Sequence, residues 1–505
     1  MQKGDNVMQL TNEGIKNKAD WEAKGYKLPS YDREKVTANT KANPTWIHFG
    51  AGNIFRAFQA NAVEKLLEDG TLDTGLIVAE GYDYEIIEKY NRPCDNLSIL
   101  ATLKADGTVE KTVIGSIVEA CILDEENQAE IERLREIFRA PSLQMVSFTI
   151  TEKGYKTRAY MNKVVGLILE RFKAGSLPIS IVSMDNCSHN GDKLKEAVVE
   201  IANEWVAEGK CEKGFVDYVE NPKVVAFPLS MIDKITPRPD DTVKKMLESD
   251  GVEGTEPIVT SKNTYVSNFV NAEETEYLVI EDLFPNGRPS LEKAGIIFTD
   301  RETVDKTEKM KVCTCLNPLH TALAIFGCLL GYKTIHDEME DEALKKLVTT
   351  LGKEEGMKVV VDPKVLSPQD FLDAVLTKRL PNPFMPDTPQ RIACDTSQKL
   401  PIRFGETIKA YRASHTLSTD SLRVIPVVLA GYLRYLEGID DEGNPFEQSP
   451  DPLLDELKAL SPKDVLKRQD VFGVDLYQDS LAKRILEIHS DMVGKGNVRR
   501  ELEEL

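Results

Sequence analysis

A turn with two glycines, Gly50-Ala51-Gly52, could bind the pyrophosphate of a dinucleotide. Gly50 would permit a tight turn, and Gly52 would let backbone N–H groups approach the phosphates where a helix begins. The third glycine of the usual fingerprint is absent, because Phe55 stands in its place. Two glycines at this spacing are common, so the interpretation depends on the elements that flank the turn.

An acidic residue, Glu80, ends the next apolar run, where a dinucleotide-binding fold places a carboxylate against the ribose. Such a carboxylate accepts hydrogen bonds from the 2′-OH and repels a 2′-phosphate, which favours NAD over NADP. Asp83 is a nearby alternative for this role. The alternative interpretation is that Glu80 is a solvated acid at the end of a strand, without a role in cofactor binding.

A lysine, an asparagine and a histidine follow one another in Lys311-Val-Cys-Thr-Cys-Leu-Asn317-Pro-Leu-His320. Oxidation of a secondary alcohol needs a base for the hydroxyl proton, and a lysine whose pKa is depressed by burial can serve without a metal. Side-chain amides can donate hydrogen bonds to the developing alkoxide. Taken alone, the three residues also fit a surface charge, a helix cap before proline and a buried histidine.

The elements around these residues alternate between strands and helices. Residues 45–50 form a short apolar run before the glycine turn, and the apolar positions after the turn recur at helical spacing until the next run, GLIVAEG. Such a βαβ unit predicts a doubly wound parallel sheet, an α/β Rossmann-like fold. Further strands are predicted within residues 142–150, 177–186 and 223–233.

The second part of the chain is predicted to be mostly helical. Amphipathic patterns cover residues 321–332, 341–356, 421–436 and 464–492. We therefore expect a dinucleotide-binding domain at 1–300, with a polar extension to about residue 43, and a mainly helical substrate and catalytic domain at 301–505. Asn317-Pro318 predicts the start of a helix, which would leave Lys311 in a preceding non-helical segment.

Composition excludes several classes of function. A net charge of -20 without a basic run argues against nucleic-acid binding. No run approaches the roughly 20 apolar residues that cross a bilayer, and the N-terminus lacks the apolar core of a secretory signal. The eight cysteines and six histidines form no cluster with metal-site spacing, so we expect no metal, buried free thiols and a cytoplasmic location.

Six motifs, in order along the chain, resemble those of the mannitol dehydrogenase family, and the first of them contains the glycine turn. They are HFGAGNIFRAF (48–58), TITEKGY (149–155), SMDNCSHNG (183–191), PLSMIDKITP (228–237), YLVIEDLFPNGRP (277–289) and DTPQRIACDTSQKLPIRF (387–404). The resemblance runs from about residue 46 to at least 403. It implies an NAD-dependent, metal-independent oxidoreductase that acts on a sugar-derived alcohol or ketone, as a monomer or homodimer.

The resemblance also implies roles for individual residues. Lys311 would be the acid/base, Asn186 and Asn317 would hold the alkoxide oxygen, and His320 would bind a substrate hydroxyl. The implied cofactor residues are Gly50, Gly52, Asn53, Ile54, Arg56, Glu80 and Thr151. The implied substrate residues are Asp233 and Lys234, the latter at a position where the family usually has arginine, together with Arg391, Lys399 and Arg403.

One departure concerns the catalytic spacing. The family pattern has four residues between its lysine and asparagine, whereas five separate Lys311 from Asn317. A bulge in a non-helical segment could absorb the extra residue. Lys309 is the alternative acid/base, and a catalytically silent NAD-binding protein is the alternative function.

The substrate is predicted from charge and resemblance together. An anionic sugar acid needs a well-placed cation, which Arg391, Lys399 or Arg403 could supply, although interdomain ion pairing would explain them equally well. Lys153 within TITEKGY, the chain length and the N-terminal extension resemble the hexuronate reductases of the family. We therefore expect reduction of D-fructuronate to D-mannonate with NADH, with the mannitol 2-dehydrogenase and tagaturonate reductase reactions as alternatives.

Overall fold

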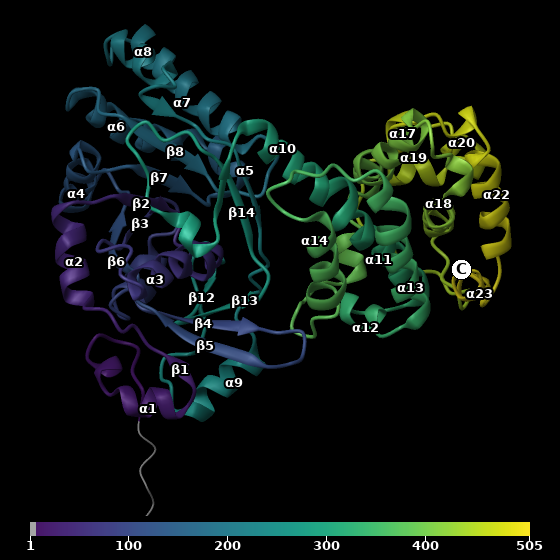
Figure 1. The fold of residues 1–505 in the computed structure, drawn as a ribbon, viewed down its shortest axis with the longest axis horizontal. Coiled ribbons are helices and arrows are strands. Elements are labelled where there is room, and N and C mark those ends of the chain that lie inside the picture. Colours follow the sequence, from purple (N-terminus) through teal and green to yellow (C-terminus); the bar gives the residue numbers. More distant parts are fainter. Residues whose placement is uncertain (1–6) are drawn as a thin grey trace, which may run out of the picture. The chain divides into compact units, whose positions relative to one another are not determined.

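The computed structural model describes residues 7–505 (Figure 1). The chain divides into two compact units. Unit 1 comprises Met1–Leu103 and Thr108–Val304, and unit 2 comprises Lys104–Gly107 and Asp305–Leu505.

The main sheet of unit 1 has six parallel strands in the order β6-β3-β2-β7-β8-β9. Their bounds are β2 (Trp46–Phe49), β3 (Leu76–Glu80), β6 (Ile117–Ile122), β7 (Met145–Phe148), β8 (Ile179–Ser183) and β9 (Val225–Ala226). The chain enters at the centre, builds outward to one edge and then to the other, which is the order of doubly wound dinucleotide-binding folds. The predicted fold class is confirmed, and the strand order reverses between β2 and β7.

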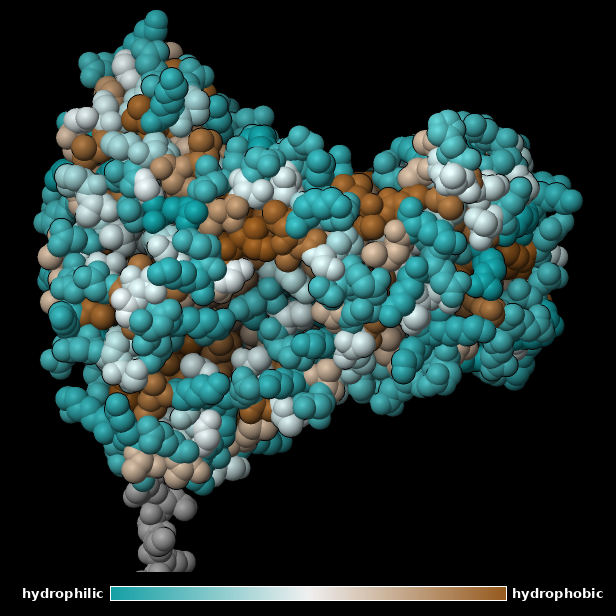
Figure 2. All heavy atoms as spheres, in the orientation of Figure 1, coloured by the Kyte–Doolittle hydropathy of each residue, from teal (hydrophilic) through white to brown (hydrophobic). Residues whose placement is uncertain are grey.

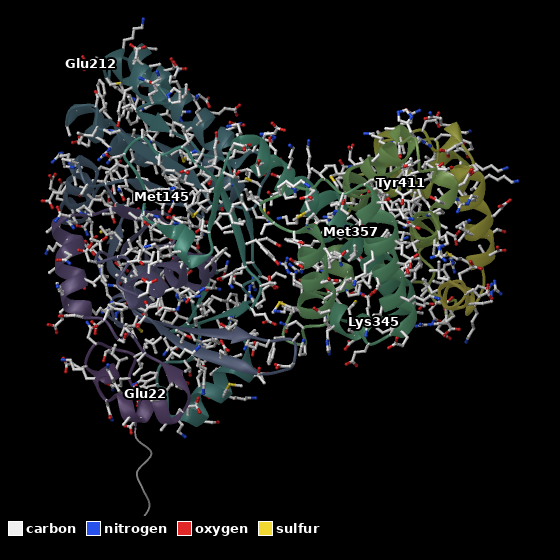
Figure 3. All side chains as sticks on the ribbon, in the orientation of Figure 1. Glu22, Met145, Glu212, Lys345, Met357 and Tyr411 are labelled. Atoms are coloured by element: carbon white, nitrogen blue, oxygen red, sulfur yellow. The ribbon has the colours of Figure 1, made fainter. Side chains whose placement is uncertain are left out.

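Both faces of this sheet are buried, because side chains alternate along each strand. Ile47 and Ile77 pack on one face, while Trp46 and Val78 pack on the other. The first face is covered by α4 (Gln128–Arg139), α6 (Arg158–Lys173), α7 (Asn190–Ala207) and α8 (Gly214–Glu220), the second by α3 (Ala60–Glu68) and α2 (Arg33–Ala42). Figure 3 marks Met145 of β7 among the side chains of this core.

Three smaller sheets complete unit 1. They are β1-β5-β4-β13 (Tyr26–Lys27, Val109–Ile114, Ser98–Leu103, Phe269–Glu273), β10-β14-β15 (Ser230–Asp233, Tyr277–Glu281, Ile297–Thr299) and the hairpin β11-β12 (Ile258–Val259, Tyr265–Val266). Residues 223–233 were predicted to form a strand that runs into a loop; the structure has a second strand after the loop, and β9 and β10 lie in different sheets. Pro228 stands between them and has no N–H to continue a ladder.

Unit 2 is helical, as predicted. Its principal helices are α11 (Asn317–Leu330), α13 (Glu342–Thr350), α14 (Pro368–Ala374), α17 (Glu406–Ala413), α18 (Val424–Leu436), α22 (Leu481–Met492) and α23 (Asn497–Glu503). Helices α11 and α18 form its core, and every residue of α18 is buried. The prediction of one helix over residues 464–492 is wrong, because Gly473 adopts φ +73° and ends the short α21 (Gln469–Phe472).

One helical run, Arg301–Leu330, is long and apolar enough to cross a membrane, although the sequence was expected to contain no such segment. It comprises α10 (Arg301–Met310), a π-helical turn η5 (Lys311–Cys315) and α11. Within the structure 78% of its apolar window is buried, as in the core helix of a folded domain. Figure 2 shows a surface on which hydrophilic residues predominate, with hydrophobic residues in smaller patches.

All eight cysteines are free. Cys121, Cys315 and Cys328 are buried, but the other five are only half-buried, so the prediction that all the thiols are buried is wrong for these five.

A buried acid on α3, Glu64, links this helix to the rest of unit 1. Its carboxyl accepts hydrogen bonds from the Gly115 N–H (2.8 Å) and the Tyr31 hydroxyl (2.9 Å), and it is 4% exposed. Burial raises the pKa of Glu64 from its ordinary value of 4.5 to about 8. The folded protein therefore keeps this carboxyl protonated at pH values where the unfolded chain has released the proton.

This difference predicts how stability depends on pH. The contribution of Glu64 to the free energy of unfolding should be fully present below about pH 4.5. It should fall by about 1.4 kcal/mol per pH unit as the pH rises to about 8. Glu64→Gln should therefore flatten the fall in the unfolding free energy of unit 1, measured with denaturant at several pH values. Glu125→Gln, at an exposed position elsewhere in unit 1, should leave the slope unchanged. Parallel curves for Glu64→Gln and the wild type would contradict the prediction.

Candidate active site

The glycine turn connects β2 to the helix that begins at Asn53. Gly50 has φ +109°, and a Cβ there would lie 2.3 Å from the Thr149 carbonyl oxygen, so only glycine fits. A Cβ at Gly52 would meet nothing within 4 Å. The protein therefore needs Gly50 for its own packing, while Gly52 leaves open space beside the N-terminus of a helix, where a phosphate binds well.

Glu80 supports this turn from the end of β3. Its Oε2 accepts the Ala51 N–H (3.0 Å), and its Oε1 accepts the N–H groups of Tyr82 (2.9 Å) and Asp83 (3.2 Å). Burial raises the pKa of this carboxyl. The predicted ribose acid thus lies beside the glycine turn, and it also orders the loop that follows β3.

Two other candidate cofactor residues have their partners inside unit 1. The guanidinium of Arg56 is 1% exposed and donates to the Ser98 hydroxyl (2.7 Å) and the Ser267 carbonyl (2.8 Å). Asp83 is also buried and accepts a hydrogen bond from the Thr260 hydroxyl (2.6 Å). Arg56 therefore supports the helix after the turn from within the core, and Asp83 anchors the β11–β12 hairpin.

A pocket of about 340 Å³ opens at the carboxyl ends of β7, β8 and β10. Four predicted site residues line it: Ile54, Thr151, Asn186 and Lys234. Ligands of doubly wound folds bind at this edge, beside the point where strand order reverses. The structure thus brings residues from four separate sequence motifs to one pocket of unit 1.

Asp185 organises the pocket wall, although sequence reasoning did not single it out. Its carboxylate accepts the N–H groups of Thr151 (2.8 Å) and Ile150 (3.1 Å) and the hydroxyl of Tyr155. Thr151 is held at φ +65°, which is unusual for a β-branched residue. Burial raises the pKa of Asp185, while these donors lower it. The SMDN motif contained this residue, but only the fold reveals that it joins two loops.

His48, which was not predicted as a site residue, contacts the hydroxyl of a residue that lines the pocket. Its ring nitrogens lie 2.6 Å from the Ser147 hydroxyl and 2.8 Å from the Thr149 hydroxyl. Burial lowers the pKa of His48 to about 3, so its ring is neutral. Because Thr149 lines the pocket, this neutral histidine orients a pocket residue across β2 and β7.

The predicted substrate residues on β10 and after it are largely enclosed. Asp233 is 7% exposed. The ammonium of Lys234 lies 2.8 Å from a Glu276 carboxylate oxygen and 3.0 Å from the Glu273 carbonyl, and its side chain is 3% exposed. Since its charge is already matched by Glu276, Lys234 is poorly suited to bind a substrate carboxylate.

In unit 2, Lys311 lies in a helix rather than in the non-helical segment expected from the sequence. It begins the π-helical turn η5, in which the Leu316 N–H donates to the Lys311 carbonyl (3.1 Å), and its side chain is buried at 4% exposure. A π-turn accommodates one residue more than an α-helical turn. The extra residue between Lys311 and Asn317 is therefore absorbed inside the helix.

Asn317 and His320 follow in α11. The helix begins at Asn317 as predicted, but Leu316 rather than Asn317 occupies the N-cap position. The amide of Asn317 has no hydrogen-bond partner among residues 7–505, which leaves its donors available for a substrate oxygen. The Nε2 of His320 lies 3.5 Å from a carboxylate oxygen of Asp387.

Four cations lie near enough to His320 to influence its charge state, and we name them the cationic cluster: Arg379, Arg391, Lys399 and Arg403. Burial first, and then these positive charges, lower the pKa of His320 to about 3. The cluster contains the three C-terminal residues predicted for substrate binding, and it adds Arg379, which no motif indicated. A neutral histidine among four cations can bind a hydroxyl within a site that attracts an anion.

The members of the cluster differ in their partners. Arg391 is mostly exposed and pairs with Asp387, and the ammonium of Lys399 donates to the Ile392 carbonyl (3.0 Å). Arg403 donates to the hydroxyl of Thr321, next to His320, and has no other partner among the described residues. Burial lowers the pKa of Arg403 to about 10. Its remaining N–H groups can therefore donate hydrogen bonds to a carboxylate.

Sequence comparison matches both units to one family. The model of the mannitol dehydrogenase Rossmann domain matches residues 44–293, and that of the mannitol dehydrogenase C-terminal domain matches residues 303–492. A relative from Thermotoga maritima, called D-mannonate oxidoreductase, is 51% identical, and the alignment covers 99% of each chain. A mannitol 2-dehydrogenase from Pyrenophora tritici-repentis is 30% identical over 90% of this chain and 79% of its own.

Solved structures agree on the fold. D-sorbitol dehydrogenase in substrate-free form superposes with a TM-score of 0.79 at 24% identity, covering 95% of this chain and 97% of the other. Pseudomonas fluorescens mannitol 2-dehydrogenase, in a ternary complex with NAD and D-mannitol, gives 0.69 at 23% identity, covering 98% and 99%. With both family domains matched in order and a relative half identical along the whole chain, this protein belongs to the mannitol dehydrogenase family.

Proposed function

We propose that this oxidoreductase interconverts D-fructuronate and D-mannonate with NADH or NAD as cofactor. The observation that carries the substrate assignment is the cationic cluster, in which Arg403 keeps free donors beside His320. A neutral polyol carries no carboxylate with which such a cluster could pair, whereas a hexuronate does. The name of the relative from Thermotoga maritima, D-mannonate oxidoreductase, agrees with this assignment.

The nucleotide site of unit 1 fits a dinucleotide. The open space at Gly52, the helix that begins at Asn53 and the acid at Glu80 match the needs of a pyrophosphate and a ribose. Ile54 and Thr151 would line the nicotinamide end, since both face the 340 Å³ pocket. Bound NADH would supply the hydride, and the carboxylate of Glu80 disfavours the 2′-phosphate of NADP.

Unit 2 supplies the acid/base and substrate groups in this proposal. Lys311 donates a proton to the ketone oxygen during reduction and takes it back during oxidation. The Asn317 amide donates a hydrogen bond to that oxygen, and neutral His320 binds a neighbouring hydroxyl. Arg403 holds the carboxylate, and Asn186 helps to hold the alkoxide oxygen, as the family resemblance implies.

We also propose a division of work along the chain. Residues 1–300 would bind the nucleotide, and residues 301–505 would bind the sugar acid and carry the acid/base. A cytoplasmic location and a monomeric or dimeric enzyme remain part of the proposal, in keeping with eight free cysteines.

Parallel assays of NADH oxidation with D-fructuronate, D-tagaturonate and D-fructose test the substrate assignment. The proposal predicts the highest kcat/KM with D-fructuronate. Preference for D-fructose would assign the chain to mannitol 2-dehydrogenase chemistry, and preference for D-tagaturonate to the other hexuronate reaction. NADH binding without turnover of any of the three would contradict the proposed reaction.

Two glycine variants test the nucleotide turn. Gly52→Ala should leave the melting temperature unchanged, because its Cβ enters empty space, but should weaken NADH binding about ten-fold or more by filling the phosphate cradle. Gly50→Ala should instead lower the melting temperature, because its Cβ meets a backbone carbonyl at 2.3 Å. Calorimetric titration with NADH and thermal unfolding separate the two effects. Wild-type NADH affinity in Gly52→Ala would place the pyrophosphate elsewhere.

A further inference from the structure

We propose that Tyr82 and Lys262 form the adenine-binding face of the nucleotide site, an inference that rests on NAD(H) as the cofactor. Tyr82 would stack on the adenine ring, and Lys262 would hold the tyrosine from its other side. Neither residue belongs to a motif that the sequence resemblance assigns to the cofactor.

Tyr82 stands next to the acid that marks the ribose. Its backbone N–H donates to Glu80 Oε1 (2.9 Å), so its position is fixed relative to that carboxylate. Tyr82 is the most exposed large apolar side chain of residues 7–505, at 62%. A flat aromatic ring that is exposed beside the proposed ribose site is able to stack on a base.

A second element covers one side of this ring. The ammonium of Lys262, in the loop between β11 and β12, lies 5.1 Å from the centroid of the Tyr82 ring. This loop is fastened to the segment after β3, since the Thr260 hydroxyl donates to Asp83 (2.6 Å) and the Ser261 N–H donates to Glu85 (3.0 Å). The hairpin therefore orients the exposed ring from one side.

The chemistry of the open side favours a purine. A flat aromatic side chain can stack on the flat ring of a base, and such a contact contributes about 1–3 kcal/mol to binding. In a doubly wound fold the adenosine lies at the end of the second strand, which here is β3 and ends at Glu80. Tyr82 is the aromatic residue that directly follows this point, so adenine is the occupant to which its open face is assigned.

The test compares nucleotides with and without adenosine. Tyr82→Ala should weaken NADH binding about ten-fold, measured by calorimetric titration, because one stacked base is lost. It should leave binding of reduced nicotinamide mononucleotide unchanged, since that ligand has no adenine. Tyr82→Phe, which keeps the ring, should bind NADH like the wild type, and Lys262→Ala should give an intermediate loss.

Tyr265→Ala is the matched control, because Tyr265 lies on the same hairpin, is 40% exposed and has the Arg238 guanidinium 4.7 Å from its ring. It should bind NADH like the wild type. The adenine face is refuted if Tyr82→Ala keeps full NADH affinity, or if it weakens both nucleotides equally. Absence of NADH binding by the wild-type enzyme is a different result, and it would overturn the cofactor assignment together with this inference.

Discussion

Replacing Lys311 by alanine is expected to lower kcat for D-fructuronate reduction by about 10³-fold. Lys311 is buried in the π-turn and is the proposed proton donor to the ketone oxygen. Because the residues proposed to bind the nucleotide lie in unit 1, NADH affinity should stay at the wild-type value. Single-turnover kinetics with saturating NADH measure the loss directly.

Lys309 provides the control for this prediction. It is exposed and lies two positions earlier, in α10, so Lys309→Ala should retain wild-type turnover. If the extra residue before Asn317 had displaced the catalytic lysine, the effects of the two variants would be exchanged. A large loss in Lys309→Ala with an active Lys311→Ala would therefore contradict the assignment.

Replacing Arg403 by glutamine is expected to raise the KM for D-fructuronate by about 10- to 100-fold, the effect of losing a charge-assisted hydrogen bond. Arg403 has free N–H donors beside His320, and glutamine keeps a hydrogen-bonding group but no charge. The change in kcat should be smaller, because the carboxylate is remote from the reacting carbonyl. Steady-state kinetics with D-fructuronate and D-fructose separate lost charge recognition from general damage.

Arg412→Gln is the matched variant, since Arg412 lies in the next helix, α17, and pairs with Asp479. It should leave the KM for D-fructuronate unchanged. An unchanged KM in Arg403→Gln would remove Arg403 as the carboxylate group. Equal losses with the acid and the neutral sugar would show a structural role instead.

The doubly wound sheet could be predicted because its strands are buried on both faces and read as continuous apolar runs, as in residues 45–50 and 177–186. Breaks within patterns were harder to predict. Residues 223–233 are mostly apolar, yet Pro228 stands between two strands that belong to different sheets. Residues 464–492 keep helical spacing, yet Gly473 in a left-handed conformation ends a helix there.

The candidate site shows the same limit at the level of single residues. Motifs indicated Lys311, Asn317 and the C-terminal cations, but not that a π-turn would absorb the extra residue, because hydrogen-bond register inside a helix has no simple sequence signal. Arg379 influences the charge state of His320, and Asp185 accepts the Thr151 N–H; both partners are distant in sequence, so only the fold reveals these relations. Glu80 was predicted by position, whereas its bonds to the glycine turn follow from the packing of β2 beside β3.

Transfer of deuterium from 4-deuterated NADH to D-fructuronate is the most direct test of the proposed hydride transfer. Both 4-position isotopomers of the cofactor should be used, so that either face of the nicotinamide is covered, and the product should be identified by NMR and mass spectrometry. The proposed reaction predicts D-mannonate with one deuterium at carbon 5 from one isotopomer. A product other than D-mannonate, or D-mannonate without deuterium from both isotopomers, would contradict it.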